Sequence, residues 1–232
     1  MKTEAKTVPV AGGAVPVHCV RPGQPGPLLA VVPSIFGVSP DVEGYASLFA
    51  QHGALVYVLD SFWRTTPGPL PVGRGARSAL QRMRETHPDD VCADLLAAVD
   101  AGLSDQDCNG RVLLLGICFG GQPVVRVAQS RRVDGVAVWH GAGLSRVLVP
   151  DALAHTPIAL DFGAVDPLIP PREVDQVREA LAQADAQVRV HAGAGHGFTH
   201  RGTPKFVEAA AQAAERSVLE MIAASRANES GA

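Results

Sequence analysis

The sequence has no apolar run long enough to cross a bilayer and no excess of charge of one sign. Its 232 residues carry 20 lysines and arginines against 23 acidic residues, a formal net charge of -3. Binding to nucleic acid or to an anionic membrane surface relies on a cationic patch, so this balance argues against both partners. The polar amino-terminal residues lack the apolar core of a signal peptide. We therefore expect a cytoplasmic protein.

Cysteine is also scarce. The chain has four cysteines, and they show neither a C-x-x-C motif nor the Cys/His spacing of a zinc site. We predict reduced thiols and no metal site. The four positions are Cys19, Cys92, Cys108 and Cys118.

Short apolar runs alternate with amphipathic stretches along most of the chain. The runs are typical of strands buried on both faces, and the stretches between them are typical of helices. The pattern predicts one α/β domain over residues 1–232, with a mostly parallel central sheet and helices on both faces. Only residues 228–232 resemble a loose tail. We expect a hairpin of 6–10 with 15–20, strands at 28–33, 54–60, 112–115, 135–139, 158–162 and 187–191, and helices at 40–53, 89–102, 119–129, 172–184 and 204–224.

Residues 61–88 interrupt this alternation with a stretch rich in proline, glycine and arginine. A connection of this length is more often a lid or binding loop than structureless filler. We expect an insertion or lid near the active site, with a short helix near 76–83. Its arginines are expected to form a solvated face, with an anion-attracting rim as the alternative. They are Arg64, Arg74, Arg77, Arg82 and Arg84.

Cys118 lies between glycines at the end of an apolar, strand-like run, in the sequence Gly116-Ile-Cys-Phe-Gly120. This is the G-x-S-x-G elbow with sulfur in place of oxygen, a strained turn that exposes a nucleophile between a strand and a helix. Glycines on either side avoid Cβ clashes there. Cys118 is therefore a candidate nucleophile; the alternative is a small buried hydrophobe.

A thiol nucleophile needs a base, and the base needs a third group to orient it. The order nucleophile, acid, histidine, each after a later strand, is met by Asp166 and His196. Asp161 is a second candidate for the acid, although it lies within the expected strand. We predict a triad of Cys118, His196 and Asp166; a turn-forming Asp and a solvated loop His are the alternatives.

Acyl transfer also needs two backbone NH groups directed at the developing oxyanion. Phe119, directly after the nucleophile, is the first candidate, and Ile35, after the strand at 28–33, is the second. Gly37 gives this second turn the freedom to approach a substrate.

Five short segments share a pattern with a known family: residues 34–38, 116–121, 140–141, 162–166 and 195–198. Together they resemble the dienelactone hydrolases (carboxymethylenebutenolidases). The resemblance implies an α/β-hydrolase fold, the Cys118/His196/Asp166 triad, hydrolysis of an unsaturated lactone from catechol-derived aromatics, and no cofactor. One position departs from the pattern: Ser34 stands where the family has a glutamate that helps take the thiol proton. Either His196 activates Cys118 alone, or Asp60, Glu43 or a substrate group contributes, or the substrate differs.

The family also holds a substrate carboxylate with arginines. Here His200 stands where one is expected, with Arg201 adjacent and Arg64 at the end of another strand, so an anionic small-molecule substrate is expected, bound by a monomer or homodimer. A packed histidine is the alternative for His140, and a core aromatic for Trp63 and Trp139. The candidate substrate-binding residues are Ser34, Phe36, Trp63, Arg64, Trp139, His140, Phe198, His200 and Arg201.

Three functions are compatible with these features. The first is a cysteine hydrolase of a small lactone or ester. The second, suggested by Ser34 and the Arg-rich insertion, is hydrolysis of another ester or a thioester, or a different ring-opening step in an aromatic or secondary-metabolite pathway. The third is a non-catalytic binding protein that keeps the fold.

Overall fold

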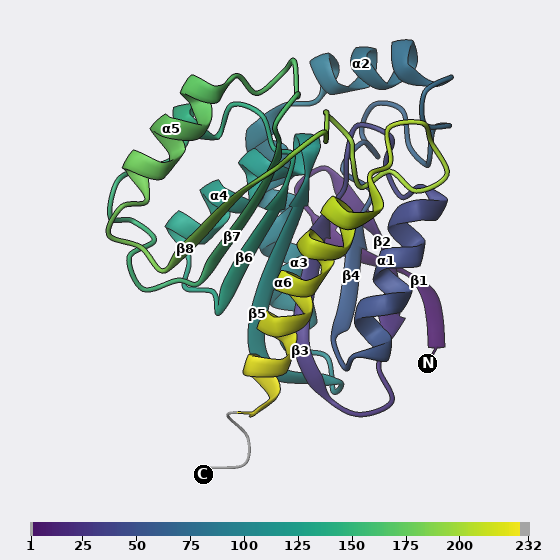
Figure 1. Ribbon diagram of the computed structural model, residues 1–232. Helices are drawn as coiled ribbons and strands as arrows, with labels where there is room; N and C mark the ends of the chain where they lie inside the picture. Colours follow the sequence, from purple (N-terminus) through teal and green to yellow (C-terminus); the bar gives the residue numbers. More distant parts are fainter. Residues whose placement is uncertain (1, 228–232) are drawn as a thin grey trace.

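The computed structural model describes residues 2–227, so the predicted loose tail at 228–232 lies outside the described residues. One eight-stranded sheet has the order β1-β2-β4-β3-β5-β6-β7-β8 (Figure 1). Strands β3 to β8 pair in parallel, while β1 and β2 form an antiparallel hairpin at one edge. The strands are β1 (Lys2–Val10), β2 (Gly13–Arg21), β3 (Gly26–Val32), β4 (Leu55–Leu59), β5 (Cys108–Ile117), β6 (Gly135–Trp139), β7 (Ile158–Gly163) and β8 (Ala186–His191).

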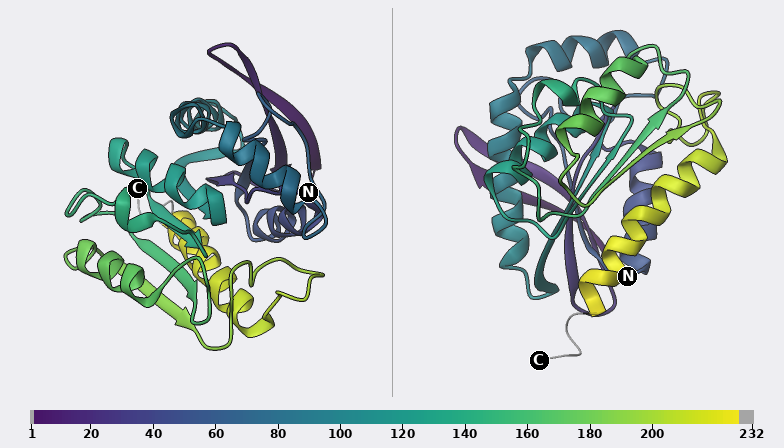
Figure 2. Two further views of the ribbon diagram at one scale, coloured as in Figure 1. Left: turned by 90° about the horizontal axis from the view of Figure 1, so that it is seen from above. Right: turned by 60° about the vertical axis from the view of Figure 1, so that its left-hand side comes forward.

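Helices cover both faces of this sheet (Figure 2). Helices α1 and α6 pack on one face, and α3, α4 and α5 pack on the other. Within residues 2–227, no helix has the length and apolar character needed to span a membrane. The helices are α1 (Pro40–Gln51), α2 (Ala76–Glu85), α3 (Pro88–Leu103), α4 (Gly121–Ser130), α5 (Pro171–Ala180) and α6 (Glu208–Ala227), with 3₁₀ turns η1 (Cys118–Gly120) and η2 (Leu144–Arg146).

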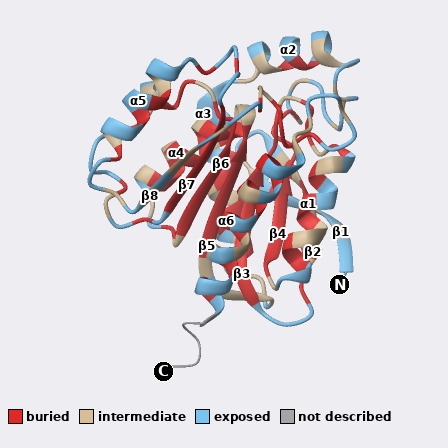
Figure 3. Ribbon diagram, in the orientation of Figure 1, coloured by how far each residue is buried: buried red, intermediate tan, exposed pale blue. Residues whose placement is uncertain are grey.

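The central strands are buried on both faces, as their continuous apolar sequences predict (Figure 3). In β3, Leu28 and Ala30 pack towards α3 and α4, whereas Leu29 and Val31 pack towards α1 and α6. Full burial of one such leucine or valine stabilises the fold by about 1.5–3 kcal/mol. The predicted α/β fold with a mostly parallel sheet is thereby confirmed.

Three predicted helix boundaries were wrong. The helix expected at 119–129 begins with the 3₁₀ turn η1, and its α-helical part starts at Gly121. The helix expected at 172–184 ends at Ala180, because the NH of Ala182 and that of Ala184 bond in turns instead. The helix expected from 204 begins at Glu208, because 203–206 closes a separate turn through the Phe206 NH and the Thr203 carbonyl.

Candidate active site

Cys118 directly follows β5 and has a left-handed backbone conformation, with φ of 54°. This conformation is strained for a residue with a Cβ, and such strain is concentrated at functional sites. A Cβ at Gly116 would overlap the Gly120 carbonyl, and one at Gly120 would overlap the Val32 carbonyl. The glycines of the motif are therefore required for the elbow to pack tightly, Gly116 against the turn that follows it and Gly120 against β3.

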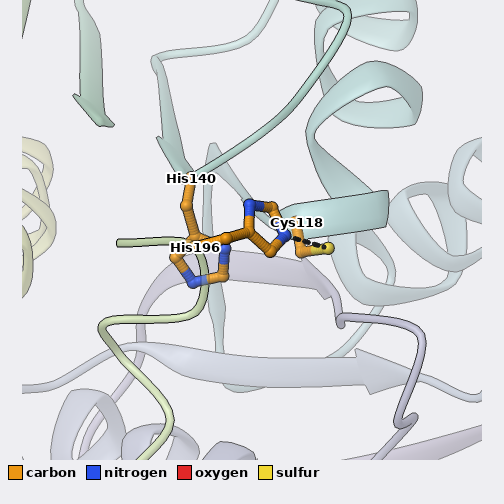
Figure 4. A group of neighbouring side chains, drawn as sticks. All are labelled: Cys118, His140 and His196. Atoms are coloured by element: carbon orange, nitrogen blue, oxygen red, sulfur yellow. Dashed lines mark hydrogen bonds between the residues drawn. The ribbon is translucent and has the colours of Figure 1, made fainter. Parts of the chain in front are cut away.

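The loops after β7 and β8 bring Asp166 and His196 to Cys118. The Cys118 sulfur lies 3.1 Å from His196 Nε2, and His196 Nδ1 donates a hydrogen bond of 2.8 Å to Asp166 Oδ2 (Figure 4 shows the Cys118 and His196 side chains). Asp166 is buried, and its other oxygen accepts a hydrogen bond from the Leu168 NH at 2.8 Å. Both oxygens of this carboxylate are thus engaged, which fixes the orientation and tautomer of the imidazole.

The surroundings of His196 favour its protonated form. Burial alone would lower the pKa of His196, but the hydrogen bonds to Asp166 and Cys118 outweigh burial and raise the pKa to about 9. An imidazolium beside the sulfur stabilises the thiolate, which is the nucleophilic form of cysteine. The arrangement therefore places a thiol, an imidazole and a carboxylate within hydrogen-bond reach of one another, in the order that nucleophilic catalysis requires.

Asp161, the other candidate for the acid, has different partners. Its carboxylate accepts hydrogen bonds from Arg189 Nε at 2.9 Å and from His191 Nε2 at 2.8 Å. Asp161 therefore holds β7 and β8 together rather than orienting His196.

Two backbone segments line the same cavity as Cys118. Ile35, in the turn after β3, and Phe119, in the first turn of η1, both line the cavity that contains Cys118. The NH groups of a helix's first turn have no partner within the helix, so the Phe119 NH is available to an oxyanion. In the Ile35 turn, Ser34 Oγ accepts a hydrogen bond from the Phe36 NH at 3.3 Å.

Arg82, in α2, fastens this turn to the insertion. Its fully buried side chain donates two hydrogen bonds to the Ile35 carbonyl, at 2.9 and 2.7 Å, and others to the carbonyls of Thr66 and Gly68. Gly37 has a φ of 72°, and a Cβ there would press against the Arg82 guanidinium. The expectation of a solvated face is therefore wrong for Arg82, and no sequence signal separates it from the exposed Arg77 and Arg84 of the same helix.

The cavity above Cys118 has a volume of about 1090 Å³. The insertion contributes one wall of it through α2 and the residues before it, and the loop at 196–205 contributes another. Figure 1 shows α2 lying across this end of the sheet. Residues 61–88 thus include a wall of the cavity, which composition alone could not specify. From the insertion, the lining includes Val72, Arg74, Ala76, Leu80, Met83 and Thr86.

His140 and His200 are neighbours, with ring centroids 5.6 Å apart. His140 is fully buried, and burial with the charges of His196 and His200 holds the pKa of His140 well below its usual value, so its ring is neutral. Its Nε2 pairs with Thr199 Oγ1 at 2.8 Å, and its ring centroid lies 5.1 Å from that of His196. His200 lines the cavity, and its Nδ1 pairs with Asp41 Oδ2 at 2.7 Å.

Of the residues predicted to bind substrate, Phe36 and His200 line the cavity and His140 packs beside His196. Trp63 and Arg64 do not line it, because both bind the buried carboxylate of Asp94. Trp63 Nε1 donates to Asp94 at 2.8 Å, and the Arg64 guanidinium stacks on the Trp63 ring. The pair joins the insertion to α3.

Four more of these residues do not line the cavity either. Trp139 is fully buried against Tyr45 and Phe49 of α1, and Phe198 packs under His140. Arg201 forms an ion pair with Glu215 at 2.6 Å. Ser34 is fully buried in its own turn, where its hydroxyl oxygen accepts a hydrogen bond from the Phe36 NH.

One set of side chains has the chemistry of a metal site that the sequence spacing did not predict. Ligand atoms of Cys118, His140 and His196 all lie within 4.8 Å of one another (Figure 4). Thiolate and imidazole are ligands that Zn²⁺ accepts. The cysteine and His196 atoms of this set are, however, the same atoms that pair at 3.1 Å beside Asp166, as expected of a nucleophile and its base.

The fold and this arrangement define an α/β-hydrolase with a Cys-His-Asp constellation at the carboxyl end of its sheet. Residues 15–225 match the model of the dienelactone hydrolase family. The chain belongs to this family and is a hydrolase acting on ester or lactone bonds.

Individual relatives agree with this assignment. A carboxymethylenebutenolidase from a Pseudomonas species is 29% identical over 229 residues, covering 96% of this chain and 95% of the relative. A dienelactone hydrolase structure from Anabaena variabilis is 20% identical with a TM-score of 0.70, covering 97% of this chain and 98% of that one. A dienelactone hydrolase-like promiscuous phosphotriesterase from metagenomic libraries is 19% identical with a TM-score of 0.76, covering 97% and 99%.

Proposed function

We propose that the protein is a cysteine-dependent hydrolase of a small ester or unsaturated lactone, with Cys118 as the nucleophile. The observation that carries the proposal is the contact of 3.1 Å between the Cys118 sulfur and His196 Nε2, with His196 Nδ1 held by Asp166. His196 serves as general base and acid, and Asp166 orients it. No cofactor is needed for this chemistry.

In the first half of the reaction, the Cys118 thiolate attacks the carbonyl carbon and forms a carbon–sulfur bond. The negative charge moves to the carbonyl oxygen, which the NH groups of Ile35 and Phe119 stabilise. When this intermediate collapses, the carbon–oxygen bond breaks and His196 gives its proton to the leaving oxygen. The product of this half is a thioester on Cys118.

In the second half, His196 Nε2 takes a proton from water while the water oxygen attacks the thioester carbon. The carbon–sulfur bond then breaks and releases the carboxylic acid. The sulfur leaves as a thiolate, and the imidazolium beside it stabilises that charge.

The missing glutamate at position 34 bears on how the thiol is ionised. Asp60 accepts hydrogen bonds from the NH groups of Phe62 and Gly68, and Glu43 lies 3.9 Å from His18, so both have other partners. His196, with its pKa raised to about 9, is the base in contact with the sulfur. We therefore assign ionisation of Cys118 to His196 without a second carboxylate.

The substrate is a small molecule that reaches Cys118 through the cavity. Two exposed cations, Arg74 and Lys205, are among its lining residues and would hold an anionic group at the rim. His200 supplies a further polar group close to His196. A hydrolase of this kind needs no nucleic acid, membrane or second subunit to complete its site.

The test compares Cys118→Ala with the matched variant Cys92→Ala, whose thiol lies on α3 and does not line the cavity. Hydrolysis of 4-nitrophenyl acetate and of a dienelactone is followed as kcat/KM. We expect Cys118→Ala to lose about 10³-fold or more, and Cys92→Ala to match the unmodified protein. Full activity in Cys118→Ala would exclude Cys118 as the nucleophile.

A further inference from the structure

The cavity above Cys118 has the properties of a site for a substrate with an extended apolar group. We propose that the preferred substrate is an ester or thioester with an unbranched or cyclic apolar acyl group of several carbons, held between α2 and the start of α4. This proposal rests on the proposed function, because it names the substrate class of the same site.

The size of the cavity is the first argument. Pockets that hold drug-sized ligands measure roughly 300–1,000 Å³, and this one measures about 1090 Å³. A monocyclic dienelactone would fill only a small part of that space. The remainder of the cavity would hold water against apolar walls. An apolar substituent of the substrate would displace this water, which is favourable.

The chemistry of the wall is the second argument. Leu80 and Met83 of α2 face the cavity together with Phe119, Pro123 and Leu168 from the sheet end. Leu80 is 40% exposed and Leu168 is 58% exposed, so two large apolar side chains that line the cavity remain in contact with water. An apolar group bound there would remove part of this area from water.

The arginines near the site already bind other groups of the protein, which is the third argument. Arg82 is committed to three backbone carbonyls, Arg64 to Asp94, and Arg201 to Glu215. Deep charge recognition of a small carboxylate by these side chains would require breaking those bonds. The cations that do line the cavity, Arg74 and Lys205, are exposed residues.

The orientation of the substrate follows from the two walls. His196 must give its proton to the leaving oxygen, so the leaving group lies towards the loop at 196–205. That loop lines the cavity with the polar residues His200, Thr203 and Lys205. The acyl group is left with the opposite, apolar wall, formed by α2 and the start of α4.

The experiment measures kcat/KM for 4-nitrophenyl esters from acetate to octanoate. The leaving group is constant, so the series reports acyl recognition alone. We expect kcat/KM to rise roughly two- to fourfold for each added methylene up to about hexanoate. A flat or falling series in an enzyme that still depends on Cys118 would overturn the substrate class and leave the proposed function intact.

Substitutions of lining residues show which side chains recognise the acyl group. Leu80→Gln and Met83→Gln, both in α2, should each lower the ratio of octanoate to acetate kcat/KM by about fivefold or more. Val149→Gln is the matched control, since Val149 is 56% exposed and does not line the cavity, and it should leave the ratio unchanged. An equal ratio in all three variants would contradict the assignment of this wall.

A binding measurement separates the two proposals if no ester is hydrolysed through Cys118. Aliphatic amides from acetamide to octanamide are titrated calorimetrically into Cys118→Ala. Tighter binding with each methylene supports the apolar acyl site even where the cysteine mechanism fails. Equal affinities along the series would overturn the acyl site regardless of turnover.

Discussion

The two walls of the cavity are built in different ways. On one wall, Cys118, Asp166 and His196 follow the strands β5, β7 and β8, which belong to one parallel, in-register part of the sheet. On the other wall, α2 belongs to the insertion, and the buried Arg82 joins it to the Ile35 turn through backbone carbonyls. The catalytic wall is thus positioned by topology, and the insertion wall by a few polar bonds. We propose that catalysis takes place on the first wall and selection of the acyl group on the second.

The largest effect is expected from Asp166→Asn on the catalytic wall. An asparagine cannot hold His196 in the required tautomer, and kcat should fall by about 10⁴-fold. The pKa of His196, measured by NMR titration, should drop below its raised value of about 9. Asp161→Asn is the control, because Asp161 bonds to Arg189 and His191 instead, and it should keep kcat near that of the unmodified protein. The reverse ranking of the two variants would make Asp161 the orienting acid.

Arg82→Met tests whether the insertion wall also positions the oxyanion site. Loss of its bonds would free the Ile35 turn, and a displacement of about 1 Å at such a group costs roughly 10²-fold in rate. We expect kcat to fall by that amount with little change in KM. Arg82→Lys, which keeps the charge but not the forked geometry, should be intermediate.

The control for Arg82 is Arg77→Met, an exposed arginine of the same helix. It should leave kcat unchanged. Chemical denaturation of each variant shows whether the fold persists. If folded Arg82→Met protein retained full kcat, Arg82 would have a structural role only.

The pH dependence of activity separates the protonation of His196 from the rest of the site. Because its pKa is raised to about 9, His196 stays protonated through neutral pH and loses its proton above that value. We expect kcat/KM to fall roughly tenfold for each pH unit above about 9, because the leaving oxygen is no longer protonated. The same raised pKa contributes stability that is complete below the unfolded value near 6.5 and is lost as pH rises through about 9. A fall centred near pH 6.5 would contradict the Asp166 contact.

The smallest effect on activity is expected from Arg64→Met. This change leaves the buried Asp94 carboxylate without its ion-pair partner, so the free energy of unfolding should fall by about 3 kcal/mol. Turnover should stay within about twofold of the unmodified protein, since Arg64 does not line the cavity. A large rise in KM that is confined to anionic substrates would show that Arg64 does bind the substrate.

The difference between the two walls also explains which parts of the site could be predicted from the sequence. The alternation of apolar runs predicted the parallel sheet, and strand ends in such a sheet meet at one edge, which brought Cys118, Asp166 and His196 together from 30 or more residues apart. Arg82 could not be identified in this way. A buried arginine and a solvated one have the same sequence signal until the partners, here the carbonyls of Ile35 and Gly68, are placed in space.

The wrong binding predictions have the same origin. The sequence places Arg201, Arg64 and Trp139 after strands, at the end of the sheet where the cavity lies. In the structure, Arg201 pairs with Glu215 and Arg64 pairs with Asp94. Trp139 packs against the aromatic side chains of α1. The end of a strand fixes the backbone position of a residue, but it does not fix the direction of a long side chain. The positions of the short side chains at the elbow could therefore be predicted more closely than the directions of the long side chains around it.

The most direct test of the account is to trap the acyl group on the enzyme. Protein mixed with 4-nitrophenyl acetate is quenched in acid during the first turnover, and the intact mass and its peptides are measured. The account predicts a gain of one acetyl group, carried by the peptide that contains Cys118. A burst of 4-nitrophenol with the acetyl group on another residue, or turnover with no acyl-enzyme at any quench time, would contradict it.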